Sequence, residues 1–141
     1  MKIRSIIFTV ASVLILSVVT FAAKPPVKVT KAFESKFSDA ANIKWAKENA
    51  KEWEAAFTVN GVKMSANFAN DGSWVETESE IVIAELPDAV ASSIKSLHTG
   101  WEVSHAYKIE SASKGTSYEL EIKSGKKKQE VMLKEDGTNV K

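Results

Sequence analysis

The sequence contains no cysteine and only two histidines among its 141 residues. Without cysteine the chain can form no disulfide, even in an oxidising compartment, and it cannot carry the lipid anchor of a lipoprotein. A structural zinc site is also unsupported, because such sites usually take several cysteine and histidine ligands at fixed spacing. The stability of the fold must therefore come from a hydrophobic core, for which four tryptophans and six phenylalanines are available.

A surplus of charge of one sign is also missing. The formal charge of the whole chain is +1, and it becomes −1 when Lys2 and Arg4 are removed with the first 22 residues. A near-neutral domain without a dominant basic face is a poor candidate for binding nucleic acid. We therefore expect no nucleic-acid partner.

The first 22 residues have the pattern of a cleavable export signal. A basic start precedes an apolar run from Ile6 to Val19, and Thr20-Phe21-Ala22 puts small residues at positions −3 and −1 of a cut after Ala22. A cut one residue later ranks second, because it would put the bulky Phe21 at −3. The alternative is an uncleaved membrane anchor, for which the apolar run is only marginally long enough.

The sequence thus predicts a signal peptide at residues 1–22 and a mature domain at 23–141. After cleavage the domain would work in the periplasm or outside the cell, with no further attachment to the membrane. A mature chain of this length is the size of a single domain.

Two halves of the mature chain resemble each other. Trp53-Glu54-Ala55-Ala56-Phe57 aligns with Tyr118-Glu119-Leu120-Glu121-Ile122 at an offset of 65 residues, and at the same offset Asn70-Asp71-Gly72 falls on Glu135-Asp136-Gly137. Upstream, Pro26, Val29 and Phe33 match Pro87, Val90 and Ile94 at an offset of 61. Ungapped matches of this kind predict an internal repeat, with one copy at about 26–83 and the other at about 86–141.

Each copy has helix and strand periodicities. Apolar residues recur at helical spacing in Val29, Phe33 and Phe37, and again in Leu86, Val90, Ile94 and Leu97. Between Trp101 and Ile109 apolar or aromatic residues alternate with polar ones, which predicts a strand with Trp101, Val103, His105, Tyr107 and Ile109 on its buried face.

The firmest local prediction is a hairpin at Asn60-Gly61, because a type I′ turn needs positive φ at both central residues. It would pair Val59 with Val62, Phe57 with Met64, Ala55 with Ala66 and Trp53 with Phe68. The second copy would pair Tyr118 with Leu133, Leu120 with Val131 and Ile122 with Gln129. We therefore predict an α+β fold of two tandem helix–strand–hairpin–strand repeats, whose antiparallel sheet is covered on one face by helices.

Several segments resemble one known family. They are Asn-Ile-Lys-Trp at 42–45, Trp-Glu-Ala-Ala-Phe at 53–57, Asn-Asp-Gly-Ser-Trp-Val-Glu-Thr-Glu at 70–78 and Glu-Leu-Pro-Asp-Ala-Val at 85–90. This pattern is similar to the PepSY-like, β-lactamase-inhibitor-like proteins of bacterial envelopes. The resemblance implies tandem units packed on an antiparallel sheet, secretion, and a binding role in place of catalysis; it supplies no catalytic motif. The chain departs from the family at Phe37-Ser38-Asp39, where a proline more usually follows the aromatic residue.

The wet face of the predicted sheet carries the candidate binding residues Glu54, Trp74, Glu76 and Glu78. Glu76, Glu78 and Glu80 alternate along one strand, so their carboxylates share a face. A solvated strand face that discourages aggregation is the plain interpretation, and a ligand patch or a calcium site is the alternative. A two-residue turn at Asp71-Gly72 would place Trp74 on this wet face, whereas a longer loop with a bulge would turn it inward.

No set of residues suggests catalysis. No serine lies in a Gly-x-Ser-x-Gly turn, and no cofactor loop or metal spacing is present in the sequence. The leading hypothesis is a non-catalytic secreted binding module that needs no cofactor and recognises a protein or peptide in the bacterial envelope, with enzyme inhibition as one form of this role. The alternative is an envelope structural or stress-response protein with no specific ligand. Neither hypothesis sets an oligomeric state.

Overall fold

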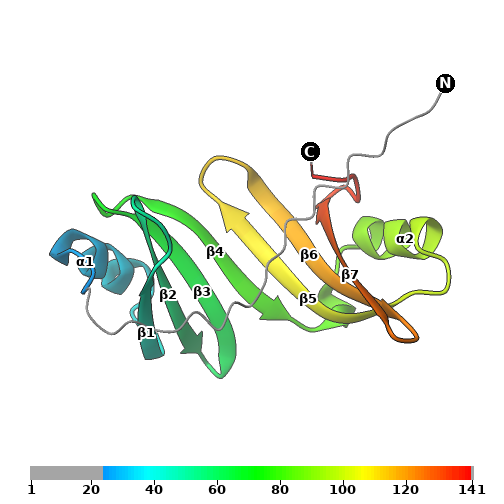
Figure 1. Cartoon of the computed structure of the whole chain (residues 1–141), viewed down its shortest axis with the longest axis horizontal. Coiled ribbons are helices and arrows are strands. Elements are labelled where there is room, and N and C mark those ends of the chain that lie inside the picture. The colour runs from blue at the N-terminus through cyan, green and yellow to red at the C-terminus, as the bar shows by residue number, and fades with distance from the viewer. Residues whose placement is uncertain (1–23, 141) are drawn as a thin grey trace.

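The computed structural model describes residues 24–140, and in them the chain forms a single seven-stranded antiparallel sheet with two helices. Each strand pairs with the next one along the chain, so the order across the sheet is β1 to β7 (Figure 1). The elements in chain order are α1 (Val27–Lys36), β1 (Ala41–Lys47), β2 (Glu52–Val59), β3 (Val62–Ala69), β4 (Trp74–Ile81), η1 (Ile83–Glu85), α2 (Asp88–Leu97), β5 (Glu102–Ser111), β6 (Gly115–Ser124) and β7 (Lys127–Lys134). The predicted signal peptide at residues 1–22 lies outside the described residues.

The predicted fold class, α+β with two tandem helix–strand–hairpin–strand repeats, is wrong. The sheet dominates the fold, and each helix has only ten residues. The strands do not form two units with their own edges, because β4 and β5 pair continuously, from Glu76 opposite Ser111 to Ile81 opposite Ala106. The second half has no counterpart of β4, since the described residues after Gly137 contribute only an isolated bridge between Leu133 and Asn139. Joining the halves hydrogen-bonds two strand edges that would otherwise be exposed.

Both helices begin directly after a proline and bury the same kind of stripe. Pro26 precedes α1 and Pro87 precedes α2, where a residue without an N–H leaves no helical hydrogen bond unmade. The helices end alike, with the Phe37 N–H donating to the Phe33 carbonyl and the His98 N–H to the Ile94 carbonyl. The buried helical residues are Val29 and Phe33 in α1 and Val90 and Ile94 in α2, as the helical spacing predicts.

The helices pack on opposite ends of the same face of the sheet, which we call the helix face (Figure 1). The core under α1 consists of Val29, Phe33, Trp53, Ala55, Phe57, Ala66 and Phe68. The core under α2 consists of Leu86, Val90, Ile94, Ala106, Tyr118, Leu120, Ile122, Val131 and Leu133. Between the cores the helix face of β4 and β5 carries Ser79, Lys108 and Glu110, and Lys108 Nζ lies 3.1 Å from Glu110 Oε1. The sheet therefore joins two separate hydrophobic cores.

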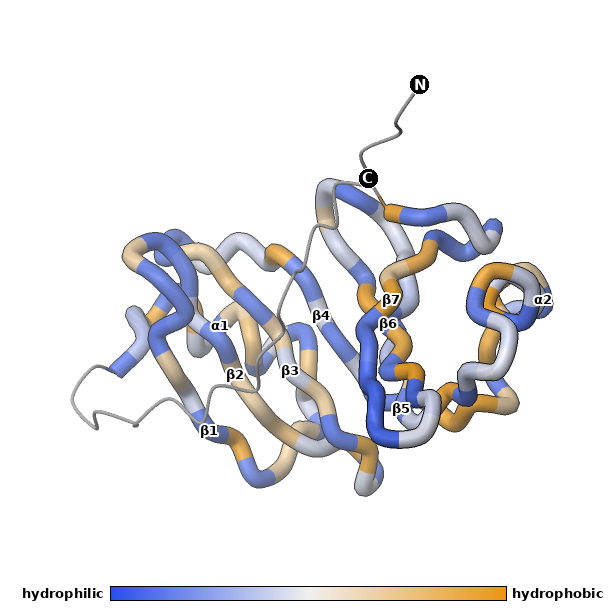
Figure 2. The backbone as a smooth tube through the Cα atoms, turned by 45° about the vertical axis from the view of Figure 1, so that its right-hand side comes forward, coloured by the Kyte–Doolittle hydropathy of each residue, from blue (hydrophilic) through white to orange (hydrophobic). Residues whose placement is uncertain are grey.

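The predicted hairpin is confirmed. Asn60 has φ 51° and Gly61 has φ 83°, the left-handed pair that a type I′ turn requires. Every predicted cross-strand pair of both hairpins is present, from Val59 opposite Val62 to Ile122 opposite Gln129. Figure 2 shows the resulting alternation of hydrophilic and hydrophobic residues along the strands.

The predicted buried face of β5 is wrong beyond Val103. A bulge places the extra residue Ser104 between the pairs Val103–Ile122 and His105–Glu121. From His105 onward the alternation is shifted by one residue, because a bulge puts two residues opposite one. Ala106 is therefore buried under α2, and His105 lies on the face opposite the helices.

Two Asp-Gly turns dock on the helices in the same way. A side chain at Gly72 would put its Cβ 2.8 Å from the Lys28 carbonyl oxygen in α1, and one at Gly137 would put its Cβ 2.5 Å from the Ala89 carbonyl oxygen in α2. Asp71 and Asp136 each accept a hydrogen bond from the backbone N–H two residues later, at 2.9 Å. These parallels support two related units, at about 26–83 and 86–141, which stay a prediction.

Candidate functional site

The face of the sheet opposite the helices, which we call the open face, is rich in glutamate at its centre. Strand pairing places Glu54 of β2, Glu76, Glu78 and Glu80 of β4, and Glu119, Glu121 and Glu130 of β6 and β7 on this face. The lysines of the same face lie toward its margins, at Lys44, Lys63, Lys123, Lys128 and Lys134. Neither helix packs on this face, so a partner could reach it.

Three of the four predicted site residues lie together here. Glu54 and Glu76 both pair with Asn67 of β3, one from each side, so the three side chains form a row across β2, β3 and β4. Glu78 lies in the next row on the same face, between Ser65 of β3 and Ile109 of β5. All three glutamates are partly exposed.

Trp74 is not part of this surface. A bulge in β4 separates the pairs Asn67–Glu76 and Phe68–Trp74, so the ring turns to the helix face and packs at the edge of the core under α1. Its Nε1 donates to Thr77 Oγ1 at 2.9 Å, and the Lys36 ammonium lies 4.0 Å from the ring centroid. Of the two positions that the sequence left open, the structure has the inward one, and its bulge is the reason.

Glu119 and Glu130 belong to the same surface, although the sequence did not mark them as site residues. Their inclusion depends on the continuous pairing of β4 through β7, which joins the halves of the chain into one face. One signal was available, because the repeat alignment at an offset of 65 puts Glu119 on Glu54. The prediction of separate units hid its meaning.

Crowding of carboxylates has a measurable effect at Glu78. Burial and the nearby charges of Glu119, Glu76, Glu54 and Glu130 raise the pKa of Glu78 from 4.5 to about 7. Burial is the largest cause, since a charged group loses hydration in a protein, and neighbouring negative charges oppose ionisation further. The centre of the open face therefore contains a carboxyl group that is half protonated near neutral pH.

Two other groups on the open face respond in the same direction. The pKa of Glu54 is raised by burial and by the charge of Glu48. The pKa of Tyr107 is raised by burial and then by surrounding glutamates, first of all Glu80. Ile109, between them and Glu119, is only 9% exposed although it lies on the uncovered face. The centre of this face is thus a poorly hydrated acidic surface.

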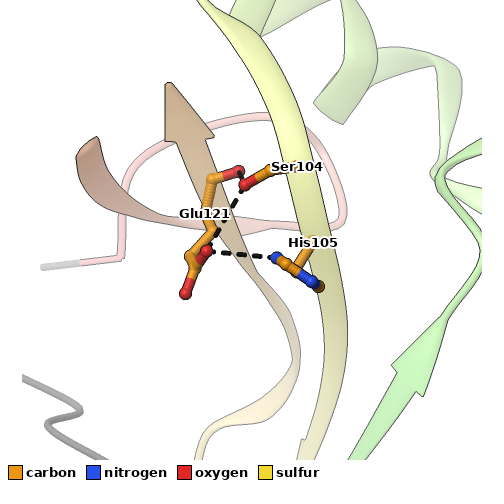
Figure 3. A network of polar contacts seen from close by, with 3 residues as sticks. All are labelled: Ser104, His105 and Glu121. Atoms are coloured by element: carbon orange, nitrogen blue, oxygen red, sulfur yellow. Dashed lines mark hydrogen bonds and ion pairs between the residues drawn. The ribbon is translucent and has the colours of Figure 1, made fainter. Parts of the chain in front are cut away.

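A serine, a histidine and a glutamate meet at the bulge in β5 (Figure 3). Glu121 Oε2 lies 3.1 Å from His105 Nδ1, and Ser104 Oγ donates to the same oxygen at 3.3 Å and to the Glu121 carbonyl at 3.1 Å. In a catalytic triad the imidazole stands between the hydroxyl and the carboxylate, so that it can take the hydroxyl proton. Here the carboxylate stands between the other two groups, an order that does not activate the serine.

Searches for other kinds of site were negative for the part of the chain that the structure describes. In residues 24–140, no group of three or more histidine, aspartate or glutamate side chains is placed to hold a metal ion. The calcium alternative for Glu76, Glu78 and Glu80 therefore has no support in this geometry. Across the same residues, no helix has the length and apolar character needed to cross a membrane.

Comparison with known proteins places the chain in a family. The model of a family described as PepSY-like, and provisionally as beta-lactamase-inhibitor-like, matches residues 51–140. The chain belongs to this PepSY-like family. The resemblance seen in the sequence is thereby confirmed. A comparison with curated proteins gave no match.

Solved structures share the fold of this PepSY-like chain. A BLIP-like protein from Bacteroides fragilis superimposes with a TM-score of 0.74 at 23% identity, covering 86% of this chain and 87% of that one. A protein from Bacteroides eggerthii, provisionally described as periplasmic, has a TM-score of 0.76 at 18% identity, covering 84% of this chain and 88% of that one. At these identities the likeness establishes the fold alone.

Proposed function

We propose that this PepSY-like chain is a non-catalytic binding module of the bacterial envelope, and that its open face recognises a basic segment of a protein or peptide. The observation that carries the proposal is the acidic centre of the open face, which is built on paired strands and left free by both helices. Strands that pair along their whole length hold the carboxylates in fixed positions, so a partner would meet a preorganised surface.

Charge favours a basic partner over other chemistry. Glu54, Glu76 and Glu78 lie in adjacent rows, and Glu119 and Glu130 extend the same surface across β6 and β7. Complementary charge steers association and selects the partner, and a partner with lysine or arginine would relieve the repulsion among these carboxylates. Inhibition of an envelope enzyme is one form that this binding could take, in line with the description of the family.

Location in the envelope rests on two observations. The chain begins with the pattern of a cleavable signal, and one protein of the same fold is provisionally described as periplasmic. Mass spectrometry of the natural protein should find a mature N-terminus at Ala23 or Lys24. Recovery of a chain that still starts at Met1 in the membrane fraction would contradict export with cleavage.

The binding proposal is tested by affinity capture from envelope extract with the mature chain as bait. Glu76→Lys reverses a charge at the centre of the open face, and Glu34→Lys reverses an exposed charge on α1 as the matched control. We expect the wild type and Glu34→Lys to retain one partner rich in basic residues, and Glu76→Lys to lose it. Retention should weaken as salt is added, because salt screens exposed charges.

Two results would count against the proposal. If no protein is retained above the level of an unrelated bait, the alternative of an envelope structural or stress-response protein without a specific ligand is favoured. If Glu76→Lys retains the partner as well as Glu34→Lys does, the binding surface lies elsewhere on the molecule.

A further inference from the structure

Glu78 occupies the middle of the open face, with no basic residue directly opposite it. Its cross-strand neighbours are Ser65 of β3 and Ile109 of β5, and along β4 it lies between Glu76 and Glu80. Directly opposed and diagonal side chains are the ones that interact across a sheet. The immediate surroundings of this carboxyl group are therefore neutral or acidic.

Charged and titratable groups face Glu78 from every neighbouring strand of the open face. They are Lys44 of β1, Glu54 of β2, Lys63 of β3, Glu76 and Glu80 of β4, Tyr107 and His105 of β5, Glu119 and Glu121 of β6, and Glu130 and Lys134 of β7. Lys44, Lys63 and Lys134 are exposed, so water and salt screen their charges. Glu119 is only 8% exposed, and its charge is screened far less. Acidic groups thus dominate the field at Glu78.

We propose that docking of a basic segment on the open face is regulated by one proton, which Glu78 holds in the free protein and releases when the partner binds. The inference rests on the proposed function and adds a control to the same surface. The raised pKa of Glu78, about 7, supports it because this proton is then exchanged close to neutral pH. A lysine or arginine placed among these carboxylates favours the ionised form of Glu78 and expels the proton.

Linkage sets the size of the effect. When binding requires the ionised form of a group that titrates near pH 7 in the free protein, affinity increases by about tenfold between pH 6 and pH 8. The partner's own charge stays constant in this range if it consists of lysine, whose side chain titrates near pH 10.4. The pH dependence then reports on the binding surface alone.

The test uses the mature chain and a synthetic peptide of eight lysines as the probe, with calorimetric titration at low salt at pH 6 and pH 8. For the wild type we expect about tenfold tighter binding at pH 8, with release of about one proton near pH 6 when two buffers of different ionisation enthalpy are compared. Glu78→Gln keeps the shape of the side chain and should bind with nearly equal affinity at both pH values. His105→Gln is the matched control, because imidazoles also titrate in this range, and it should keep the dependence of the wild type.

The possible failures separate the regulation from the function. Absence of binding at either pH would overturn the proposed recognition of basic segments. Equal affinity of the wild type at pH 6 and pH 8, or loss of the pH dependence in His105→Gln with its retention in Glu78→Gln, would overturn the regulation only. Carbon-13 NMR of the unmodified protein gives a second measurement, and a Glu78 carboxyl that titrates near pH 4.5 without the peptide would also overturn it.

Discussion

Replacing Glu78 by glutamine should make the stability of the fold less dependent on pH. The pKa of Glu78 is about 7 in the folded protein and 4.5 in its ordinary range, so the folded state retains a proton that the unfolded chain loses between these values. The free energy of unfolding therefore falls as pH rises from about 4.5 to about 7. Below this window both states are protonated, and above it both are ionised.

The magnitude follows from the shift in pKa. A difference of two to three pKa units corresponds to roughly 3 kcal/mol at full effect, and screening by water at this partly exposed side chain reduces it to about 1–3 kcal/mol. Glutamine keeps the side-chain shape and cannot ionise. Glu78→Gln should therefore be more stable than the wild type by about 1–3 kcal/mol at pH 8, and by much less at pH 5.

Urea denaturation at pH 5 and pH 8 measures this difference for the wild type and the variant. Other titrating groups contribute equally to both proteins, so the change in their difference between the two pH values isolates Glu78. Glu34→Gln, which removes an exposed charge from α1, controls for net charge. A stability difference between Glu78→Gln and the wild type that is the same at both pH values would refute the reasoning.

Three further predictions concern the scaffold. Gly137→Ala should destabilise the fold by more than Gly61→Ala in thermal melts, because both glycines have positive φ but only a Cβ at Gly137 would collide with the Ala89 carbonyl; equal losses would mean that this turn does not dock on α2. Phe57→Ala should cost about 3–5 kcal/mol in chemical denaturation and leave oligolysine affinity unchanged at temperatures where the protein is folded, because Phe57 is 3% exposed in the core under α1. Trp74→Phe should lose about 1–2 kcal/mol of stability with its hydrogen bond and its contact with Lys36, again without effect on oligolysine binding; weaker binding would place the ring on the docking surface after all.

Local patterns were readable from the sequence because short-range physics decides them. Asn60-Gly61 specifies its turn through the left-handed backbone that these two residues tolerate, and the turn then sets the register of the whole hairpin. The stripes that contain Phe33 and Ile94 follow from the helical period, and each helix begins where a proline allows it. These features also identified Glu54, Glu76 and Glu78 as residues of one face.

Two bulges could not be read in the same way. The extra residues Val75 in β4 and Ser104 in β5 shift the alternation by one, and this moves Trp74 to the helix face and His105 to the open face. A bulge changes which side chains are buried without requiring a special residue type, so an alternating sequence is compatible with it or without it. Packing decides, as the burial of Ala106 under α2 illustrates.

The sequence by itself determined the turns, the hairpin registers, the helical stripes and the family. Only the tertiary structure decided that β4 pairs with β5, because pairing between distant segments depends on which edges meet in the folded chain and leaves no local pattern. That one pairing fuses the halves into a single sheet and brings Glu119 and Glu130 to the face of Glu78. The acidic surface is therefore a property of the assembled sheet, since its charges come from strands that the chain connects only through α2 and through turns.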